Sequence, residues 1–285
     1  MSKEKKAELK KKVDTIMQGS TTPDVFKKVM AVAEDENASV NDLKTIIEHD
    51  PVIVTKVLSM ANGAYFWFPR KISSVSQAIL VLGFNMVKTL AVSTSIFSGL
   101  SAGNMRAVNM LWSHSFIVGV ASGLIAKESM AVDSDSAFIT GLLHDIGRVV
   151  MFQIFGEEYL KVSGDTREGL LQREEKVFGA SHPEVGGWLA ERINLPEGCV
   201  RSITFHHNPS ECPVDKEDPA LEYLPHVVYL ADFIVSDTGR GLDSDCEVSQ
   251  NHAWVLQSIG MENKILEILE EVKERVEELR LQECS

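Results

Sequence analysis

The chain has 285 residues, of which 44% are hydrophobic, so it is long and apolar enough to bury a core and is not a disordered tail. Its formal net charge of -13 argues against a nucleic-acid partner, because basic contacts with phosphate supply most non-specific affinity. The four cysteines have no CxxC spacing, the first residues lack the apolar core of a signal peptide, and no uninterrupted apolar run reaches the roughly 18 residues of a membrane span. These features predict a soluble, cytoplasmic protein without a nucleic-acid or membrane partner.

Apolar residues recur at spacings of three and four along most of the chain, a period typical of helices. The clearest runs are residues 40–58, 78–96 and 108–125. Alternation typical of strands is scarce, so the sequence predicts an all-α fold.

Two stretches rich in glycine or proline divide the chain. Residues 99–103 predict a break after an N-terminal helical lobe, residues 1–100, and before a helical core, residues 101–237. Residues 208–218 predict a surface loop beside the candidate site of that core. The remaining segment, residues 238–285, is expected to form C-terminal helices.

The N-terminal lobe has one segment with two interpretations. Residues 66–83 place basic residues before a run of serines and could be a helix-turn-helix-like unit, but the net charge argues against that. We favour Ser73 or Ser74 as the cap of a helix that packs on the other lobe. Its apolar positions are Val75, Ile79 and Leu82.

The C-terminal tail has a short heptad pattern, formed by Ile265, Leu269, Val272, Val276 and Leu279. Two heptads are marginal alone, so we favour a helix packed on its own domain. A homodimer seam is the alternative.

Histidines and aspartates that could bind metal recur through the predicted core: His114, His144, Asp145, His182, His206, His207 and Asp232. Neutral imidazole is the commonest metal ligand in proteins, and a carboxylate can bridge two cations. Asp145 is the candidate for that bridge. The other three histidines, His49, His226 and His252, are interpreted as surface or satisfied core residues.

Local sequence predicts how these side chains are held. Residues 141–148, Gly-Leu-Leu-His-Asp-Ile-Gly-Arg, predict a helical segment near the core, where adjacent side chains point about 100° apart. His206 and His207 should diverge in the same way. Ser181 and Pro183 predict a helix that begins at His182.

Several blocks of sequence together resemble the HDOD domain, the HD-related output domain of bacterial signalling. They are residues 58–65 (Leu-Ser-Met-Ala-Asn-Gly-Ala-Tyr), 72–83 (Ile-Ser-Ser-Val-Ser-Gln-Ala-Ile-Leu-Val-Leu-Gly), 112–115 (Trp-Ser-His-Ser), 141–148, and 206–209 (His-His-Asn-Pro). The ordered ligand series is similar to that of the HD-GYP phosphodiesterases, within the HD superfamily of metal-dependent phosphohydrolases.

The resemblance implies a centre of two divalent metal ions. It would put His114, His144, Asp145 and Asp232 around one ion, and Asp145, His182, His206 and His207 around the other. Two such ions activate water and polarise a phosphoryl oxygen, with Asp145 in the catalytic role. Arg148 stands where related enzymes often have a lysine that contacts substrate phosphate.

Two departures from the HD-GYP pattern limit what the resemblance implies. Residues 208–213, Asn-Pro-Ser-Glu-Cys-Pro, replace an acidic, glycine-rich stretch that ends in Gly-Tyr-Pro. Met110 stands where some members place a glutamate for a further metal, so we expect at most two ions.

Three functions fit the sequence. The first is an HDOD-type signalling module whose site binds metals and a nucleotide or phosphorylated ligand, and whose N-terminal lobe contacts a signalling protein. The second is an active metal-dependent phosphodiesterase or phosphohydrolase. The third is a metal-free protein-interaction scaffold, which would bury costly polar groups. Imidazole-rich sites with a bridging carboxylate favour Fe, then Mn or Zn.

Overall fold

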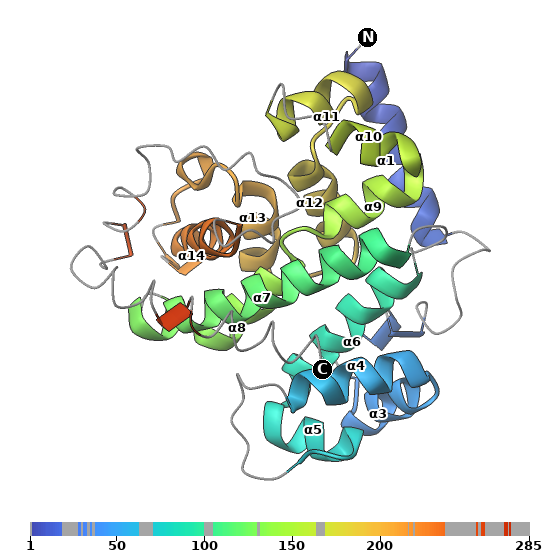
Figure 1. Cartoon of the computed structure of the whole chain (residues 1–285), viewed down its shortest axis with the longest axis vertical. Coiled ribbons are helices and arrows are strands. Elements are labelled where there is room, and N and C mark those ends of the chain that lie inside the picture. Colours follow the sequence, from blue (N-terminus) through green and yellow to red (C-terminus); the bar gives the residue numbers. More distant parts are fainter. Residues whose placement is uncertain are drawn as a thin grey trace. The chain divides into compact units, whose positions relative to one another are not determined.

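The computed structural model describes residues 2–18, 28–29, 31–32, 35, 38–62, 71–99, 105–129, 132–163, 169–215, 217–218, 220–236, 255, 258–259, 271–272 and 274. Every regular element in these ranges is a helix, which confirms the prediction of an all-α fold (Figure 1).

The chain forms two compact units. The smaller unit spans residues Met17–Ser101, and the larger one combines Met1–Ile16 with Ala102–Ser285. Most of the first helix, α1 (Ser2–Gln18), therefore belongs with the larger unit, although the predicted N-terminal lobe, residues 1–100, includes it.

The smaller unit contains α3 (Val40–Glu48), α4 (Pro51–Ala61), α5 (Val75–Leu82) and α6 (Phe84–Gly99). Two helical runs that the sequence analysis treated as continuous are thus each divided into two helices. Asp50 caps α4 by accepting hydrogen bonds from the backbone of Val52 and Ile53, and Gly83 ends α5 with a φ of 85° that favours glycine.

The cap predicted for α5 is Ser74. Its side chain accepts a hydrogen bond from the backbone nitrogen of Gln77 at 3.2 Å. Val75 and Ile79 are buried as expected, whereas Leu82 is only half-buried. The packing of this helix on the other lobe stays a prediction.

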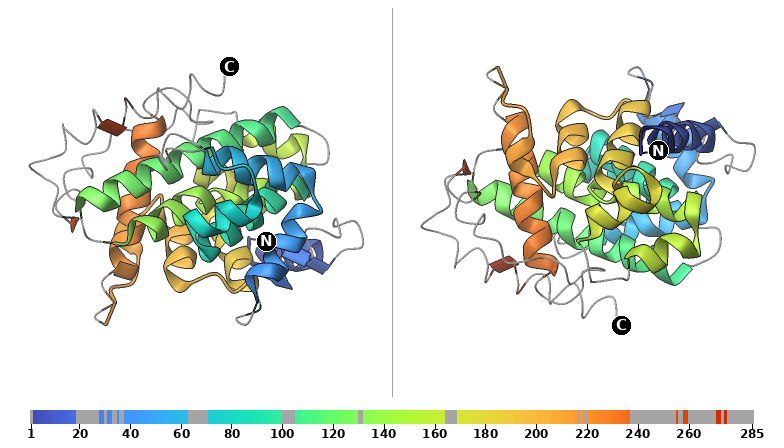
Figure 2. Two further views of the ribbon diagram at one scale, coloured as in Figure 1. Left: turned by 90° about the horizontal axis from the view of Figure 1, so that it is seen from below. Right: turned by 90° about the horizontal axis from the view of Figure 1, so that it is seen from above.

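The larger unit is built around a long helix, as the third run predicted. Its elements are α1, α7 (Met105–Ser129), α8 (Ser134–Leu143), α9 (Ile146–Phe155), α10 (Glu157–Ser163), α11 (Leu170–Phe178), α12 (His182–Arg192), α13 (Glu197–Phe205), a 3-10 helix (Pro209–Glu211) and α14 (Ala220–Val235). Figure 2 shows α14 crossing α7, and these two helices and α8 share an apolar cluster. Its members include Ile117, Val118, Ala121, Ala137, Val227, Ala231 and Ile234.

Of the heptad positions in the tail, only Val272 lies within the described residues, and it is buried in this apolar cluster. Ile265, Leu269, Val276 and Leu279 lie outside the described residues, so the homodimer seam stays a prediction.

Two close crossings of helices depend on glycine. A Cβ on Gly141 of α8 would lie 2.9 Å from Cα of Gly119 on α7. A Cβ on Gly147 of α9 would collide with the backbone of His182 and Gly186 on α12. Larger side chains would separate these helices, so the two glycines allow the histidine-bearing segments to approach one another.

Helix α1 covers the turn between α11 and α12. Leu9 is buried, Lys5 Nζ donates to the carbonyl of Val177 at 3.2 Å, and Lys6 pairs with Glu184 on α12. These contacts connect α1 to the start of the helix that carries His182.

By length and composition alone, two helical stretches could cross a membrane: Arg106–Ser129 and Ser134–Phe155. Their apolar windows are 67% and 78% buried within the fold, as is usual for the core helices of soluble proteins. The cytoplasmic location stays a prediction.

Candidate metal centre

The structure brings together all seven predicted ligand residues. His114 lies on α7, His182 is the first residue of α12, and Asp232 lies on α14. His144 and Asp145 follow α8, and His206 and His207 follow α13. Potential ligand atoms lie within 4.8 Å of one another in three overlapping groups: His182, His206 and His207; His114, His144 and Asp232; and His144, Asp145 and His206.

The local structure of the paired residues differs from the expectation. His144 is the C-cap of α8 and Asp145 the N-cap of α9, so the pair lies in a turn between two helices. His206 is likewise the C-cap of α13, and His207 lies beyond it. The apolar flanks correctly predicted burial, and His144 and His206 retain right-handed helical backbone angles although each lies just past the end of its helix.

The carboxylate of Asp145 lies at the middle of the cluster. Its Oδ1 is 3.3 Å from Nε2 of His182 and 3.7 Å from Nε2 of His206. Its Oδ2 is 3.6 Å from Nε2 of His144 and 4.0 Å from Nε2 of His114. Each oxygen thus faces two imidazoles, which is the arrangement that a bridging carboxylate needs.

Two imidazoles are oriented in the same way by the helix ends that they follow. Nδ1 of His144 donates to the carbonyl of Gly141 at 2.7 Å, and Nδ1 of His206 donates to that of Ile203 at 2.9 Å. The Nε2 atoms of both rings are buried, and neither has a hydrogen-bond partner. A buried imidazole nitrogen without a partner is costly, and a metal ion would satisfy it. The donor set therefore fits a metal ion.

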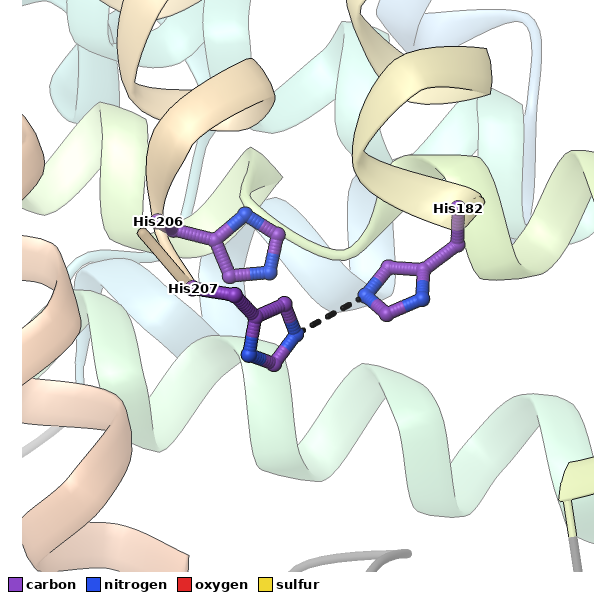
Figure 3. Close-up of side chains that lie close together, drawn as sticks. All are labelled: His182, His206 and His207. Atoms are coloured by element: carbon purple, nitrogen blue, oxygen red, sulfur yellow. Dashed lines mark hydrogen bonds between the residues drawn. The ribbon is translucent and has the colours of Figure 1, made fainter. Parts of the chain in front are cut away.

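Two further close contacts join candidate ligands on either side of Asp145. His114 Nε2 lies 3.0 Å from Asp232 Oδ1, and His182 Nε2 lies 3.1 Å from His207 Nε2 (Figure 3). Each potential metal position is thus flanked by ligand atoms of the type that divalent transition metals prefer.

A carboxylate that the sequence analysis did not single out holds His182. Glu174 on α11 is fully buried, and its Oε2 accepts hydrogen bonds from Nδ1 and from the backbone nitrogen of His182, at 2.8 and 2.7 Å. Its Oε1 accepts a hydrogen bond from the hydroxyl of Tyr159 at 2.7 Å. The one signal in the sequence is that Glu174 lies on the apolar face of its helix, four residues after Leu170 and four before Phe178.

Ser181 is the N-cap of α12, as predicted, but its side chain makes no capping hydrogen bond. Glu174 supplies the acceptor instead. The helix start at His182 is confirmed, whereas the group that stabilises it comes from another helix.

Arg148 lies in the first turn of α9 and is 6% exposed. Its Nη1 lies 3.4 Å from Oδ2 of Asp145. Its contact with a substrate phosphate stays a prediction.

Burial and charge divide the histidines into two groups. Burial lowers the pKa of His182, but the charge of Glu174 and the hydrogen bond with Asp145 outweigh this and raise it to about 9. Burial and the charge of His182 lower the pKa of His207 to about 4, and burial lowers the pKa of His206 well below its usual value. His182 therefore holds a proton at neutral pH that a metal ion would have to displace.

The carboxyl groups stay ionised in this setting. Burial raises the pKa of Asp145, but nearby His144 and Arg148 outweigh it and hold that pKa well below its usual range. The pKa of Asp232 is also lowered, because its interaction with His114 outweighs burial. Ionised carboxylates are the form that binds cations.

A model of one protein family matches most of this architecture: the HDOD domain model covers residues 20–209. The chain belongs to the HDOD family. The match includes six of the seven candidate ligands and ends before Asp232.

Solved structures share this HDOD fold. One is an HDOD domain protein of unknown function from Geobacter sulfurreducens, with a TM-score of 0.69 and 22% identity, over 91% of this chain and 90% of that one. Another, from Shewanella amazonensis, is provisionally named a phosphohydrolase and has a TM-score of 0.69 and 20% identity, over 95% of this chain and 96% of that one. At these identities the likeness concerns the fold.

Two curated relatives match parts of the sequence. An uncharacterized protein from Treponema pallidum (strain Nichols) is 26% identical over 249 residues, which are 86% of this chain and 46% of that protein. Ribonuclease Y of Lactobacillus gasseri is 30% identical over 124 residues, which are 44% of this chain and 17% of the enzyme. This HDOD chain thus spans less than half the length of either relative.

The segment after the paired histidines lies mostly at the surface, as predicted, although part of it is helical. It forms the 3-10 helix Pro209–Glu211, in which Pro209 is buried, and Cys212 is buried behind it. Val214, further along, is exposed as expected.

The histidines outside the ligand series agree with their interpretation where the structure describes them. His226 is buried, and its Nδ1 donates to the carbonyl of Glu222 at 2.8 Å, while His49 caps the end of α3. His252 lies outside the described residues.

Proposed function

We propose that the chain is a regulatory HDOD module of bacterial signal transduction whose His/Asp cluster binds two divalent metal ions. The observation that carries the proposal is the position of Asp145, each of whose oxygens faces two imidazoles. One ion would be held by His114, His144, Asp145 and Asp232, and the other by Asp145, His182, His206 and His207. Bound ions of this kind supply Lewis acidity toward phosphoryl oxygens.

The metal-free scaffold is the weaker alternative. Without an ion, the fold would bury the unpartnered Nε2 atoms of His144 and His206 beside two ionised carboxylates. Each unsatisfied group of this kind costs about 1–3 kcal/mol. Metal binding removes that cost, and the imidazole-rich donor set favours Fe, followed by Mn or Zn.

A regulatory role is favoured over turnover by the segment after His207. Its 3-10 helix, Pro209–Glu211, of which only Pro209 is buried, stands in place of the acidic, glycine-rich loop that the HD-GYP resemblance would require. Arg148 is directed to Asp145 and is nearly inaccessible. The module would then bind a nucleotide or another phosphorylated small molecule at the metals and transmit occupancy through the unit Met17–Ser101 to a partner signalling protein.

Hydrolysis of phosphodiesters is the second candidate function. It is favoured by the complete ligand series, and by the partial match to Ribonuclease Y, whose name describes cleavage of RNA. Under this alternative, Asp145 and the two ions would carry the reaction, with Arg148 at the substrate phosphate.

Metal content followed by a hydrolysis screen tests both candidates. Protein purified without oxygen should contain about two equivalents of metal, and Asp145→Ala should lose both. Wild-type protein that folds but binds no Fe, Mn or Zn would overturn the metal proposal.

The same samples separate regulation from catalysis. A regulatory module should bind a phosphorylated ligand without turning over cyclic dinucleotides or RNA, with His144→Ala as the matched control. Hydrolysis far above that control would replace the regulatory function by the enzymatic one.

A further inference from the structure

We infer that Glu174, itself held by Tyr159, is the positioning residue of His182: it fixes Nδ1 as a donor and so directs Nε2 into the metal cluster. The inference rests on the proposed metal site. The relay comes from α10, α11 and α12 and consists of two hydrogen bonds, from Tyr159 to Glu174 and from His182 Nδ1 to Glu174.

The carboxylate of Glu174 makes its hydrogen bonds with Tyr159 and His182. Its carboxylate is fully buried, and a buried charge is tolerated only when its oxygens are hydrogen-bonded. Oε1 takes the Tyr159 hydroxyl, and Oε2 takes two donors of His182, all at 2.7–2.8 Å. The carboxylate is thus fixed from both sides.

Glu174 also fixes the direction of the His182 imidazole. An ionised carboxylate can only accept, so Nδ1 of His182 must carry the proton and Nε2 points the other way. Nε2 lies 3.3 Å from Asp145 Oδ1 and 3.1 Å from His207 Nε2 (Figure 3). Outer hydrogen bonds of this kind fix the tautomer and ring orientation of metal-binding histidines and raise their basicity.

The histidines of the cluster differ in the group that accepts the hydrogen bond from Nδ1. His144 and His206 donate Nδ1 to the neutral backbone carbonyls of Gly141 and Ile203, whereas His182 donates to a charged side chain. A side-chain acceptor can be removed by substitution, and a carbonyl cannot. His182 therefore differs from His144 and His206 as a ligand, because the orientation and basicity of its imidazole depend on Glu174, a side chain of another helix.

Zinc binding by the full-length chain tests the inference, measured by competition with a chromophoric chelator. Glu174→Gln removes the charge and keeps the size, and we expect a loss of roughly 10- to 100-fold in affinity for at least one zinc ion. Glu174→Asp should recover part of it, and Tyr159→Phe should cause a smaller loss. The matched control is Glu175→Gln, the exposed neighbour, which should bind zinc as wild type does.

Folding is checked by the unfolding midpoint of each metal-free variant. If Glu174→Gln does not fold, Tyr159→Phe and Glu174→Asp decide the question, because they keep the carboxylate. A folded Glu174→Gln or Tyr159→Phe protein with wild-type zinc affinity overturns the inference.

A second readout does not depend on metal. NMR of isotope-labelled histidine rings in the metal-free protein should show a protected proton on Nδ1 of His182, assigned by its loss in His182→Asn. The signal should persist in Glu175→Gln and shift or vanish in Glu174→Gln. Failure of wild type to bind Zn, Fe or Mn would overturn the proposed function, while this signal would still decide the relay. A His182 whose Nδ1 carries no proton would overturn the relay.

Discussion

In the metal-free protein, the interaction of protonated His182 with Glu174 should contribute stability that is lost as the pH rises from about 6.5 to about 8. The pKa of His182 is raised to about 9 in the folded protein, against an ordinary value of 6.5. The stabilisation is fully present below the unfolded pKa and is lost as the pH rises toward the folded one, because the unfolded chain releases its proton first.

The size of the effect follows from this difference. Each pH unit in which only the folded state holds the proton changes the free energy of unfolding by about 1.4 kcal/mol, so the window gives about 2 kcal/mol. The pKa of His114 is also raised, through Asp232 and against the effect of burial, which adds in the same direction. Burial lowers the pKa of four other histidines, His144, His206, His207 and His226, and these oppose the trend near pH 6.5. The contribution of His182 is therefore measured as the difference between wild type and Glu174→Gln. Burial lowers the pKa of Lys56 to about 8, which opposes the trend at higher pH, so the window stops there.

Urea unfolding in the presence of a chelator, at both ends of the window, measures the effect. Glu174→Gln should lose this contribution, and Glu175→Gln should retain it. A change in the free energy of unfolding between pH 6.5 and pH 8 that is the same in wild type and in Glu174→Gln would refute the reasoning.

Three further outcomes are expected. Gly147→Ala should destabilise the protein by at least about 2 kcal/mol in urea unfolding, since its Cβ would meet the α12 backbone, whereas Gly169→Ala, in open space, should cost less than half as much; equal costs would contradict the close crossing. His206→Ala should leave about one equivalent of metal by elemental analysis while Asp145→Ala leaves none, and one equivalent in both would argue against a shared carboxylate. Ser74→Ala should lower the free energy of unfolding by about 1 kcal/mol through loss of the α5 cap, and an unchanged urea midpoint would show that the hydrogen bond contributes nothing.

The ligand residues could be predicted from sequence because their types and order are local information. The histidines and aspartates that the series named do converge, although they are distributed over 119 positions from His114 to Asp232. The assignment of individual residues to two ions stays a prediction. What periodicity could not show is that both pairs of adjacent ligands lie in turns, because apolar flanks indicate burial without indicating where a helix ends.

Helix boundaries in the smaller unit were missed for a different reason. The apolar period continues across Asp50 and Gly83, yet the aspartate before Pro51 starts a helix and the positive φ of Gly83 ends one. Both signals are visible in the sequence and outweigh periodicity locally.

Glu174 could not be assigned from sequence alone. A glutamate on an apolar helix face predicts a buried partner, but the partner, His182, is determined by the packing of α11 against the start of α12. Such tertiary pairings carry no fixed spacing in the chain, unlike the adjacent ligands His144 and Asp145.

The ends of four helices around the cluster contribute partial charges from their backbone dipoles to the site. Two helices, α8 and α13, finish there, and the partial negative charge of a helix C-terminus, about half an elementary charge, favours a cation. Two others, α9 and α12, begin there, and Glu174 accepts a hydrogen bond from the first backbone nitrogen of α12, whereas the side chain of Asp145 makes no capping hydrogen bond to α9. An approaching phosphate would therefore find the positive end of α12 already compensated, and its attraction to the site should strengthen once the metal ions have been loaded.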